Sequence, residues 1–127
     1  MTQEDKELLL KDLSARLPYG VKIRMIHHEI KGADPEYVDD VFSTTHYNMI
    51  DYDDDNYEFL PYLRPMSSMT KEEWDDCHKV GEMPHNIIDW FNKRHFDYRH
   101  LIEKGLALEA PEGMYKKDNN ESINKTS

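Results

Sequence analysis

Three aspartates of the chain alternate in the manner of ligands to a calcium ion. Asp51, Asp53 and Asp55 have the spacing of the first ligands in a helix-loop-helix calcium site. The rest of that pattern is missing, because its sixth position is Asn56 instead of glycine and its twelfth is Tyr62 instead of a bidentate glutamate. The run therefore predicts a solvated acidic turn, and we expect neither a metal ion nor another cofactor.

The histidines and the single cysteine are the other residues that could carry out chemistry. A structural zinc ion takes about four N or S ligands in closely spaced pairs, and Cys77 has no second cysteine to pair with. Its neighbours Asp75 and Asp76 would raise the pKa of the thiol, whereas a reactive cysteine needs a lowered pKa. His95 lies on an apolar stripe, where a hydrogen-bonded histidine is expected instead of a ligand.

No motif in the sequence specifies a reaction. It contains no glycine-rich phosphate loop, nucleophile elbow or zinc-protease motif. We therefore expect a protein that is not an enzyme. An enzyme of unknown chemistry remains as a third hypothesis, and it would need a carboxylate or histidine desolvated in a deep pocket.

The segment 32–63 concentrates the negative charge of the chain. It contains nine carboxylates and no lysine or arginine, while the remaining residues have 17 acids against 16 bases, so nearly all of the formal net charge of −10 lies there. Seven of the 14 aromatic residues lie in the same segment. A negative field beside amphipathic rings repels nucleic acids and anionic lipids and attracts basic proteins. The residues predicted to form a protein-binding surface are Asp39, Asp40, Tyr47, Asp51, Tyr52, Asp53, Asp54, Asp55, Tyr57 and Glu58.

Two other interpretations of this acidic segment stay open. Phosphates along one nucleic-acid strand lie about 7 Å apart, so a DNA mimic that inhibits a host nucleic-acid-binding enzyme would carry carboxylates in rows along one face. The same charges could also serve only to keep a small domain soluble. The basic residues at 93, 94, 99 and 104 are dispersed and offset by nearby acids, so direct binding of nucleic acid is not expected.

The length and the cysteine content indicate one domain in a reducing compartment. A chain of 127 residues can bury a modest core, and its only cysteine cannot form an internal disulfide. No apolar window is long enough to span a bilayer, and the N-terminal residues lack a signal-peptide pattern. We therefore expect a cytoplasmic protein that does not contact membranes.

The N-terminal half predicts one helix and a small sheet. Thr2 is a suitable N-cap for a helix that Pro18 ends, and leucines at 9, 10, 13 and 17 form its apolar stripe. Residues 21–25 alternate between apolar and basic types, which is typical of a half-buried strand. The β-branched and aromatic segments 41–47 and 57–60 predict two further strands.

The C-terminal half predicts short helices. Thr70 and Glu73 form a capping box, with Met69 and Trp74 placed for a hydrophobic staple, and Gly81 ends this helix. The other predicted helices begin at Pro84, with Ile87, Ile88, Phe91 and His95 on one face, and at Asp97, with Leu101 and Ile102 inside and Gly105 at the end.

These elements predict one α+β domain over residues 1–114 and a disordered polar tail over 115–127. A small antiparallel sheet of about three strands packs with the N-terminal helix and with two or three short C-terminal helices. The side chains expected to form the core of the C-terminal half are Trp74, Ile88, Phe91 and Leu101.

Two stretches of the C-terminal half resemble a known group of proteins. They are PYLRPMSSMTKEE at 61–73, and DWFN at 89–92 continuing through HFDYR at 95–99 to LIEKGLALEAPEGMY at 101–115, with LPYGV at 17–21 as a weaker match. This pattern is similar to small uncharacterised proteins encoded by phages, prophages and mobile elements of gut anaerobic bacteria. The resemblance implies a genomic setting in a bacterial cytoplasm and assigns no activity or functional residues.

The leading hypothesis is a non-enzymatic accessory protein of a phage or mobile element. It would bind another protein, one with a basic surface, through the acidic and tyrosine-rich segment. The sequence does not identify that partner, and it leaves formation of a homo-oligomer open.

Overall fold

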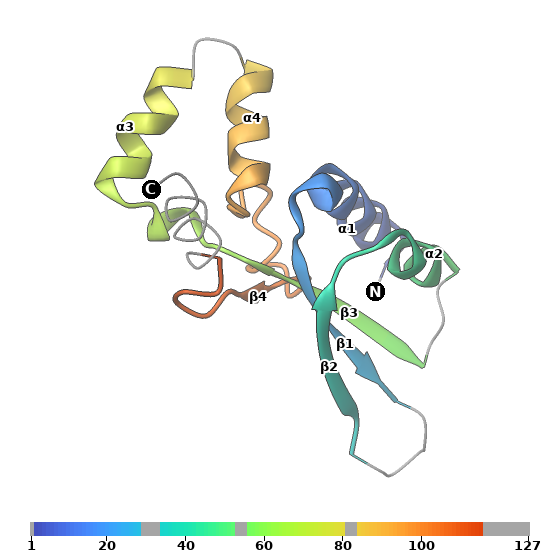
Figure 1. Ribbon diagram of the computed structural model, residues 1–127. Coiled ribbons are helices and arrows are strands. Elements are labelled where there is room, and N and C mark those ends of the chain that lie inside the picture. The colour runs from blue at the N-terminus through green and yellow to red at the C-terminus, as the bar shows by residue number, and fades with distance from the viewer. Residues whose placement is uncertain (1, 29–33, 53–55, 81–83, 116–127) are drawn as a thin grey trace.

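The computed structural model describes residues 2–28, 34–52, 56–80 and 84–115. These residues form the predicted α+β fold, with a mixed four-stranded sheet in the order β2-β1-β3-β4. The sheet has one strand more than predicted, and that strand pairs in parallel. Helices α1 and α2 lie side by side next to the sheet, and α3 and α4 form a second pair (Figure 1). The elements are α1 (Gln3–Arg16), β1 (Lys22–His27), β2 (Glu36–Val41), α2 (Thr44–Tyr52), β3 (Tyr57–Leu63), α3 (Lys71–Val80), α4 (Pro84–Lys93) and β4 (Leu108–Glu109).

Helix α1 forms as its sequence predicts. The Oγ1 of Thr2 accepts a hydrogen bond from the backbone N–H of Asp5 at 3.0 Å, which caps the first turn. Leu17 lies beyond the end of the helix, in a 3-10 turn, and is 37% exposed. The stripe of leucines that the helix buries is therefore shorter than predicted and consists of Leu9, Leu10 and Leu13.

Strand β1 lies between β2 and β3 and pairs antiparallel with both. Residues directly opposite each other in neighbouring strands place their side chains on the same face of a sheet, and successive residues alternate between faces. Ile23 lies opposite Asp40, and Arg24 lies opposite Asp39. The sheet therefore has one face that carries Ile23 and a second face that carries Arg24.

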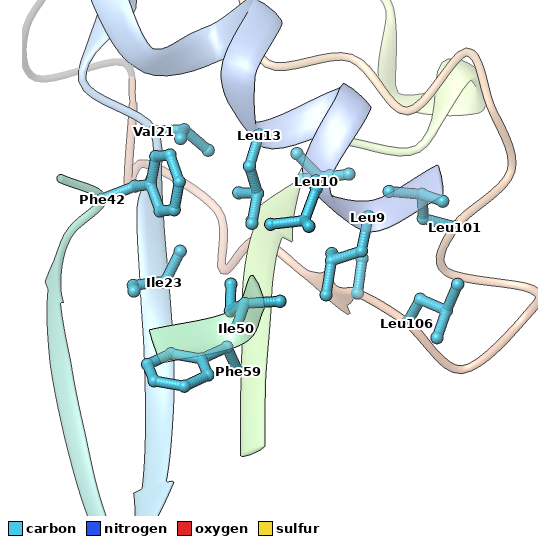
Figure 2. Close-up of a cluster of buried hydrophobic side chains, with 12 residues drawn as sticks. Leu9, Leu10, Leu13, Val21, Ile23, Phe42, Ile50, Phe59, Leu101 and Leu106 are labelled. Carbon is cyan, nitrogen blue, oxygen red and sulfur yellow. The ribbon is translucent and has the colours of Figure 1, made fainter. Parts of the chain in front are cut away.

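The face that carries Ile23 packs against α1 and α2 to form the main core. Leu10 and Leu13 project from α1 toward this face, and Ile50 of α2 lies beside Phe59 (Figure 2). The buried members of this core are Leu9, Leu10, Leu13, Val21, Ile23, Phe42, Ile50, Phe59, Leu63, Leu101, Leu106 and Ala107.

Strand β3 contains Pro61, whose backbone nitrogen faces away from β1. The N–H of His28 donates to the carbonyl of Asn56 at 2.7 Å, and this bond sets the alternation of the β1–β3 ladder. In that alternation the nitrogen of Pro61 points away from β1, toward the β4 side, where it has no hydrogen to donate. Strand β4 is two residues long and pairs only with Tyr62 and Leu63.

The predicted strand at 41–47 is wrong, because β2 ends at Val41 and α2 begins at Thr44. Ser43 precedes the helix, and its N–H donates to Nδ1 of His46 at 3.1 Å, so a histidine takes the place of the acid in a capping box. His46 and Ile50 are buried one turn apart. This local cap and the buried face override the β propensity of the segment.

The capping box at the start of α3 is confirmed, whereas the predicted core position of Trp74 is wrong. The N–H of Glu73 donates to Oγ1 of Thr70 at 3.1 Å, and Oε1 of Glu73 accepts from the N–H of Thr70 at 3.0 Å. Trp74 is 56% exposed, and Cys77 is the residue of this helix that is buried in a second small core. The helix therefore turns its cysteine and not its tryptophan inward.

Helix α4 begins at Pro84 as predicted, and Ile87 and Phe91 of its predicted face pack against the second small core. Trp90 is buried, stacks on Phe96 with ring centroids 5.7 Å apart, and donates from Nε1 to Asp76 at 3.1 Å. Ile88 is 43% exposed, so its predicted core position is wrong. An indole has a larger apolar surface than isoleucine, and here its N–H also finds a partner, so burial of Trp90 sets the rotation of the helix.

The helix predicted after Asp97 does not form. The carboxylate of Asp97 accepts hydrogen bonds from the N–H groups of Leu101 at 2.8 Å and Ile102 at 3.0 Å, four and five residues on instead of the two or three of a helix cap. His100 has a φ of 62°, and this left-handed conformation interrupts a helix. Gly105, with a φ of 74°, turns the chain again. The segment is a series of turns held by one buried carboxylate.

Tyr115, predicted as the first residue of a disordered tail, is buried. Its hydroxyl donates to the carbonyl of Tyr62 at 2.7 Å and accepts from the N–H of Lys22 at 3.0 Å. Tyr115 therefore belongs to the folded domain and not to a disordered tail. Predicted features that lie outside the described residues are the rest of the tail, the turn at 53–55 and the helix end at Gly81.

Candidate functional site

The residues predicted to form a protein-binding surface are divided between the two faces of the sheet. Asp39 and Asp40 alternate along β2, and Tyr57 and Glu58 alternate along β3, so one member of each pair points to each face. The described acids on these two strands are therefore not gathered into a single stripe. The remaining described members, all on α2, are Tyr47, Asp51 and Tyr52. The members outside the described residues are Asp53, Asp54 and Asp55.

Asp39 belongs to a compact group on the second face of the sheet. Its Oδ1 accepts a hydrogen bond from the hydroxyl of Tyr62 at 2.8 Å and forms an ion pair with Nε of Arg24 at 3.3 Å. The guanidinium of Arg24 lies 5.5 Å from the ring centroids of both Tyr37 and Tyr62. We call these four residues, Arg24, Tyr37, Asp39 and Tyr62, the sheet-face cluster.

The sheet-face cluster combines a buried ring with exposed polar groups. Burial and the hydrogen bond to Asp39 raise the pKa of Tyr62, so its phenol stays protonated and holds the carboxylate. Tyr37 is 59% exposed, and the side chains of Arg24 and Asp39 are 37% and 53% exposed. The cluster is therefore a patch with an accessible ring, an accessible carboxylate and a cation next to two rings.

A count of charges within 32–63 cannot find Arg24, which lies outside that segment. The alternation of residues 21–25 did indicate that Arg24 points away from the core. Its pairing with Asp39 depends on the register between β1 and β2, and that register is a property of the fold. Tyr37 and Tyr62 lie in the acidic segment, but the predicted surface did not include them.

The other predicted acids have weaker contacts. Asp40 Oδ2 lies 3.7 Å from Nε2 of His46, and Glu58 Oε2 lies 3.8 Å from Nε2 of His28. Both carboxylates have more than half of their side-chain surface exposed. Tyr52 is 90% exposed at the end of α2. The two carboxylates contribute negative charge around the sheet, and Tyr52 contributes an exposed neutral ring.

A second polar group lies inside the protein, between α1 and the turns that follow α4. Arg16 donates from Nε and Nη2 to the two carboxylate oxygens of Asp12 at 2.8 and 3.0 Å, and both side chains are fully buried. Arg99 donates to the same carboxylate at 2.7 Å. The ring of Tyr98 lies 5.4 Å from the guanidinium of Arg16 and 4.6 Å from that of Arg99. We call these residues, Asp12, Arg16, Tyr98 and Arg99, the interior cluster.

His95 is the most perturbed titratable group of the described residues. Burial, with the positive charges of Arg16, Arg64 and Lys22 around it, lowers its pKa to about 3. The ring stacks on Tyr115 with centroids 3.9 Å apart, and Nδ1 has no hydrogen-bond partner among the described residues. The imidazole is therefore neutral at physiological pH and buried, which fits a structural role.

Cys77 lies in an environment that opposes reactivity. Burial and the charge of Asp76 raise the pKa of its thiol, in the direction that the sequence predicts. Among the described residues, no group of three or more His, Cys, Asp or Glu side chains is placed to hold a metal ion.

A surface hollow of about 310 Å³ lies between the turn that follows β3 and the C-terminal described residues. Among the described residues that line it, Arg64 is the only basic one, and both of its terminal nitrogens donate to Glu73 at 2.7 Å. The guanidinium also covers the ring of Phe96, with 4.2 Å between its carbon and the ring centroid. The guanidinium of Arg64 is therefore bonded within the protein, and the described residues that line the hollow do not form a recognisable catalytic arrangement.

No helix in the described part of the chain is long and apolar enough to cross a membrane. No protein-family model, no curated protein and no solved structure matches this chain.

Proposed function

We propose that this chain is a non-enzymatic accessory protein that binds a basic protein through the sheet-face cluster and the acids around it. The observation that carries this proposal is the exposed ring of Tyr37 beside the partly exposed carboxylate of Asp39, on a base fixed by Arg24 and Tyr62. Tyrosine and arginine are enriched where protein interfaces gain most of their binding energy. A preorganised patch also loses little side-chain entropy on binding.

The charge around the cluster supports a basic partner. Glu36 and Asp40 are exposed on the same strand, and although they point to the opposite face of the sheet from Asp39, they add negative potential around β2. Such a field increases the rate of encounter with a basic surface. The resemblance to proteins of phages and mobile elements suggests a bacterial cytoplasm as the setting for this encounter.

DNA mimicry is the alternative for the same acids. It requires carboxylates in rows along one face, whereas Asp39 and Asp40 point to opposite faces of the sheet. This division supports protein binding over mimicry. The two functions also differ in their response to salt, because contacts that replace phosphate charge weaken steeply as salt rises, and an interface anchored by a tyrosine ring does not.

Capture from the lysate of a gut anaerobic bacterium, in a series of salt concentrations, tests this proposal. We expect the wild-type protein to retain one partner at high salt, and we expect Tyr37→Ala to lose it. Tyr52→Ala is the matched control, because that ring is more exposed but lies outside the cluster. Capture of nucleic-acid-binding enzymes that is lost steeply with salt and is insensitive to Tyr37→Ala would favour mimicry. Absence of any partner sensitive to Tyr37 would overturn the proposal.

A further inference from the structure

Strand β2 is at the end of the strand order of the described sheet, and its six residues are exposed. We propose that β2 binds an extended, lysine- or arginine-rich segment of the partner as an additional strand. This inference rests on the proposed function and specifies how the partner binds. A sheet edge recognises such a segment mainly through backbone hydrogen bonds, so the partner needs an extended conformation and a suitable charge pattern.

The ladder between β1 and β2 shows which backbone groups face the open edge. The N–H of Phe42 donates to the carbonyl of Val21 at 2.9 Å, so these two residues form a hydrogen-bonded pair. Hydrogen-bonded pairs recur at every second residue of an antiparallel ladder. Val38 and Asp40 therefore direct their backbone groups toward β1, and the residues between them direct theirs outward.

The outward backbone groups belong to Tyr37, Asp39 and Val41. The N–H of Val41 is already occupied, because it donates to Oδ1 of Asp40 at 2.7 Å. This contact closes one end of the edge. The stretch available for pairing thus centres on Tyr37 and Asp39, the two members of the sheet-face cluster that β2 supplies.

The negative charge of β2 favours a basic partner over a second copy of the chain. Antiparallel pairing of β2 with itself would bring the carboxylates of Glu36, Asp39 and Asp40 close to the same residues of the second copy. Like charges on adjacent strands are destabilising, and charged residues on an edge are a known protection against self-association. A basic strand instead meets acids on both faces of β2, because Asp39 and Asp40 alternate.

Amide hydrogen exchange measured by NMR tests the pairing directly. The probe is a ten-residue capped peptide of alternating lysine and valine, and the control peptide carries glutamate in place of lysine. We expect the lysine peptide to slow exchange of the Tyr37 and Asp39 amides about tenfold. The amides of Val38 and Asp40 face β1 and serve as internal references that should not change. The glutamate peptide should have no effect.

A matched pair of variants isolates the backbone donor. Asp39→Ala removes the carboxylate and keeps the N–H, whereas Asp39→Pro removes both, and a proline fits an outward position on an edge strand. We expect Asp39→Pro to bind the lysine peptide about fivefold more weakly than Asp39→Ala, which corresponds to one lost hydrogen bond. Thermal unfolding of both variants checks that the fold is retained, and the exchange measurement on the wild type does not depend on either variant.

The possible results separate the inference from the proposed function. If the lysine peptide binds, and Tyr37→Ala weakens it, but exchange is unchanged and the two Asp39 variants bind equally, the sheet face binds without strand pairing. That result overturns the inference and leaves the proposed function intact. If the lysine peptide does not bind at millimolar concentration, the inference is also overturned. The proposed function then depends only on capture of a partner that Tyr37→Ala loses.

Discussion

The interior cluster and the sheet-face cluster contain the same residue types in opposite environments. Each joins an aspartate to an arginine that lies over a tyrosine ring. In the interior cluster, Arg16 binds Asp12 with two hydrogen bonds and both side chains are fully buried. In the sheet-face cluster, Arg24 and Asp39 lie 3.3 Å apart and are partly exposed. Burial, and not residue type, therefore distinguishes a cluster that stabilises the fold from one that is accessible to a binding partner.

The largest expected effect comes from removal of the interior carboxylate charge. Asp12→Asn leaves the buried Arg16 and the partly exposed Arg99 without an anion, and the loss of one partner of a buried ion pair costs about 3–5 kcal/mol. Urea unfolding at neutral pH measures this loss. An unfolding free energy within about 1 kcal/mol of the wild type would contradict a structural role for the interior cluster.

A titration of the free energy of unfolding against pH tests whether His95 is buried beside positive charge. The pKa of His95 is about 3 in the folded protein and 6.5 in the unfolded chain, so the unfolded chain binds an extra proton between these values. The stability that a neutral His95 provides is therefore complete above pH 6.5 and is lost as the pH falls from 6.5 toward 3. The slope reaches about 1.4 kcal/mol per pH unit.

The variant His95→Asn is the control for this titration. Asparagine tolerates the left-handed backbone at this position, where φ is 63°, and does not titrate. Carboxylates that titrate in the same range contribute equally to both proteins, so the difference between their curves reports His95. Parallel curves for the wild type and His95→Asn would show that the imidazole is not buried beside positive charge.

The smallest effect on stability is expected for Asp39→Asn, the matched substitution in the sheet-face cluster. Asp39→Asn removes the charge and keeps an oxygen that can accept from Tyr62, so we expect a loss below about 1 kcal/mol in urea unfolding. The loss should shrink further between low and high salt, because partly exposed pairs are screened. A loss as large as that of Asp12→Asn would mean that both clusters serve stability, and it would remove the basis for assigning different roles to them.

Local signals predicted the parts of the fold that depend on a few adjacent residues. The cap at Thr2 and the capping box of Thr70 and Glu73 are confirmed because each is complete within one helical turn. The strand predicted at 41–47 and the core position of Ile88 are wrong because both depend on tertiary packing. Burial of Ile50 favours a helix in the first case, and burial of Trp90 turns Ile88 outward in the second. His46 acts as a capping partner of Ser43, a use of histidine that the usual motif does not include.

The candidate site could be predicted only in part. The acidic segment contains Asp39, and its aromatic residues include Tyr37 and Tyr62. Arg24, however, meets Asp39 only through the register of two strands, and the alternation of Asp39 and Asp40 divides the acids between two faces. Composition reports how much charge a segment has, while pairing decides where that charge points.

Pro61 limits how many molecules can join through this sheet. On the border opposite β2, the proline lacks a donor, and β4 covers only the end of β3. Because a filament grows only when every subunit offers two competent borders, the donor missing at Pro61 disfavours growth from this border of the sheet. We therefore expect one partner segment for each molecule and no polymerisation at high protein concentration.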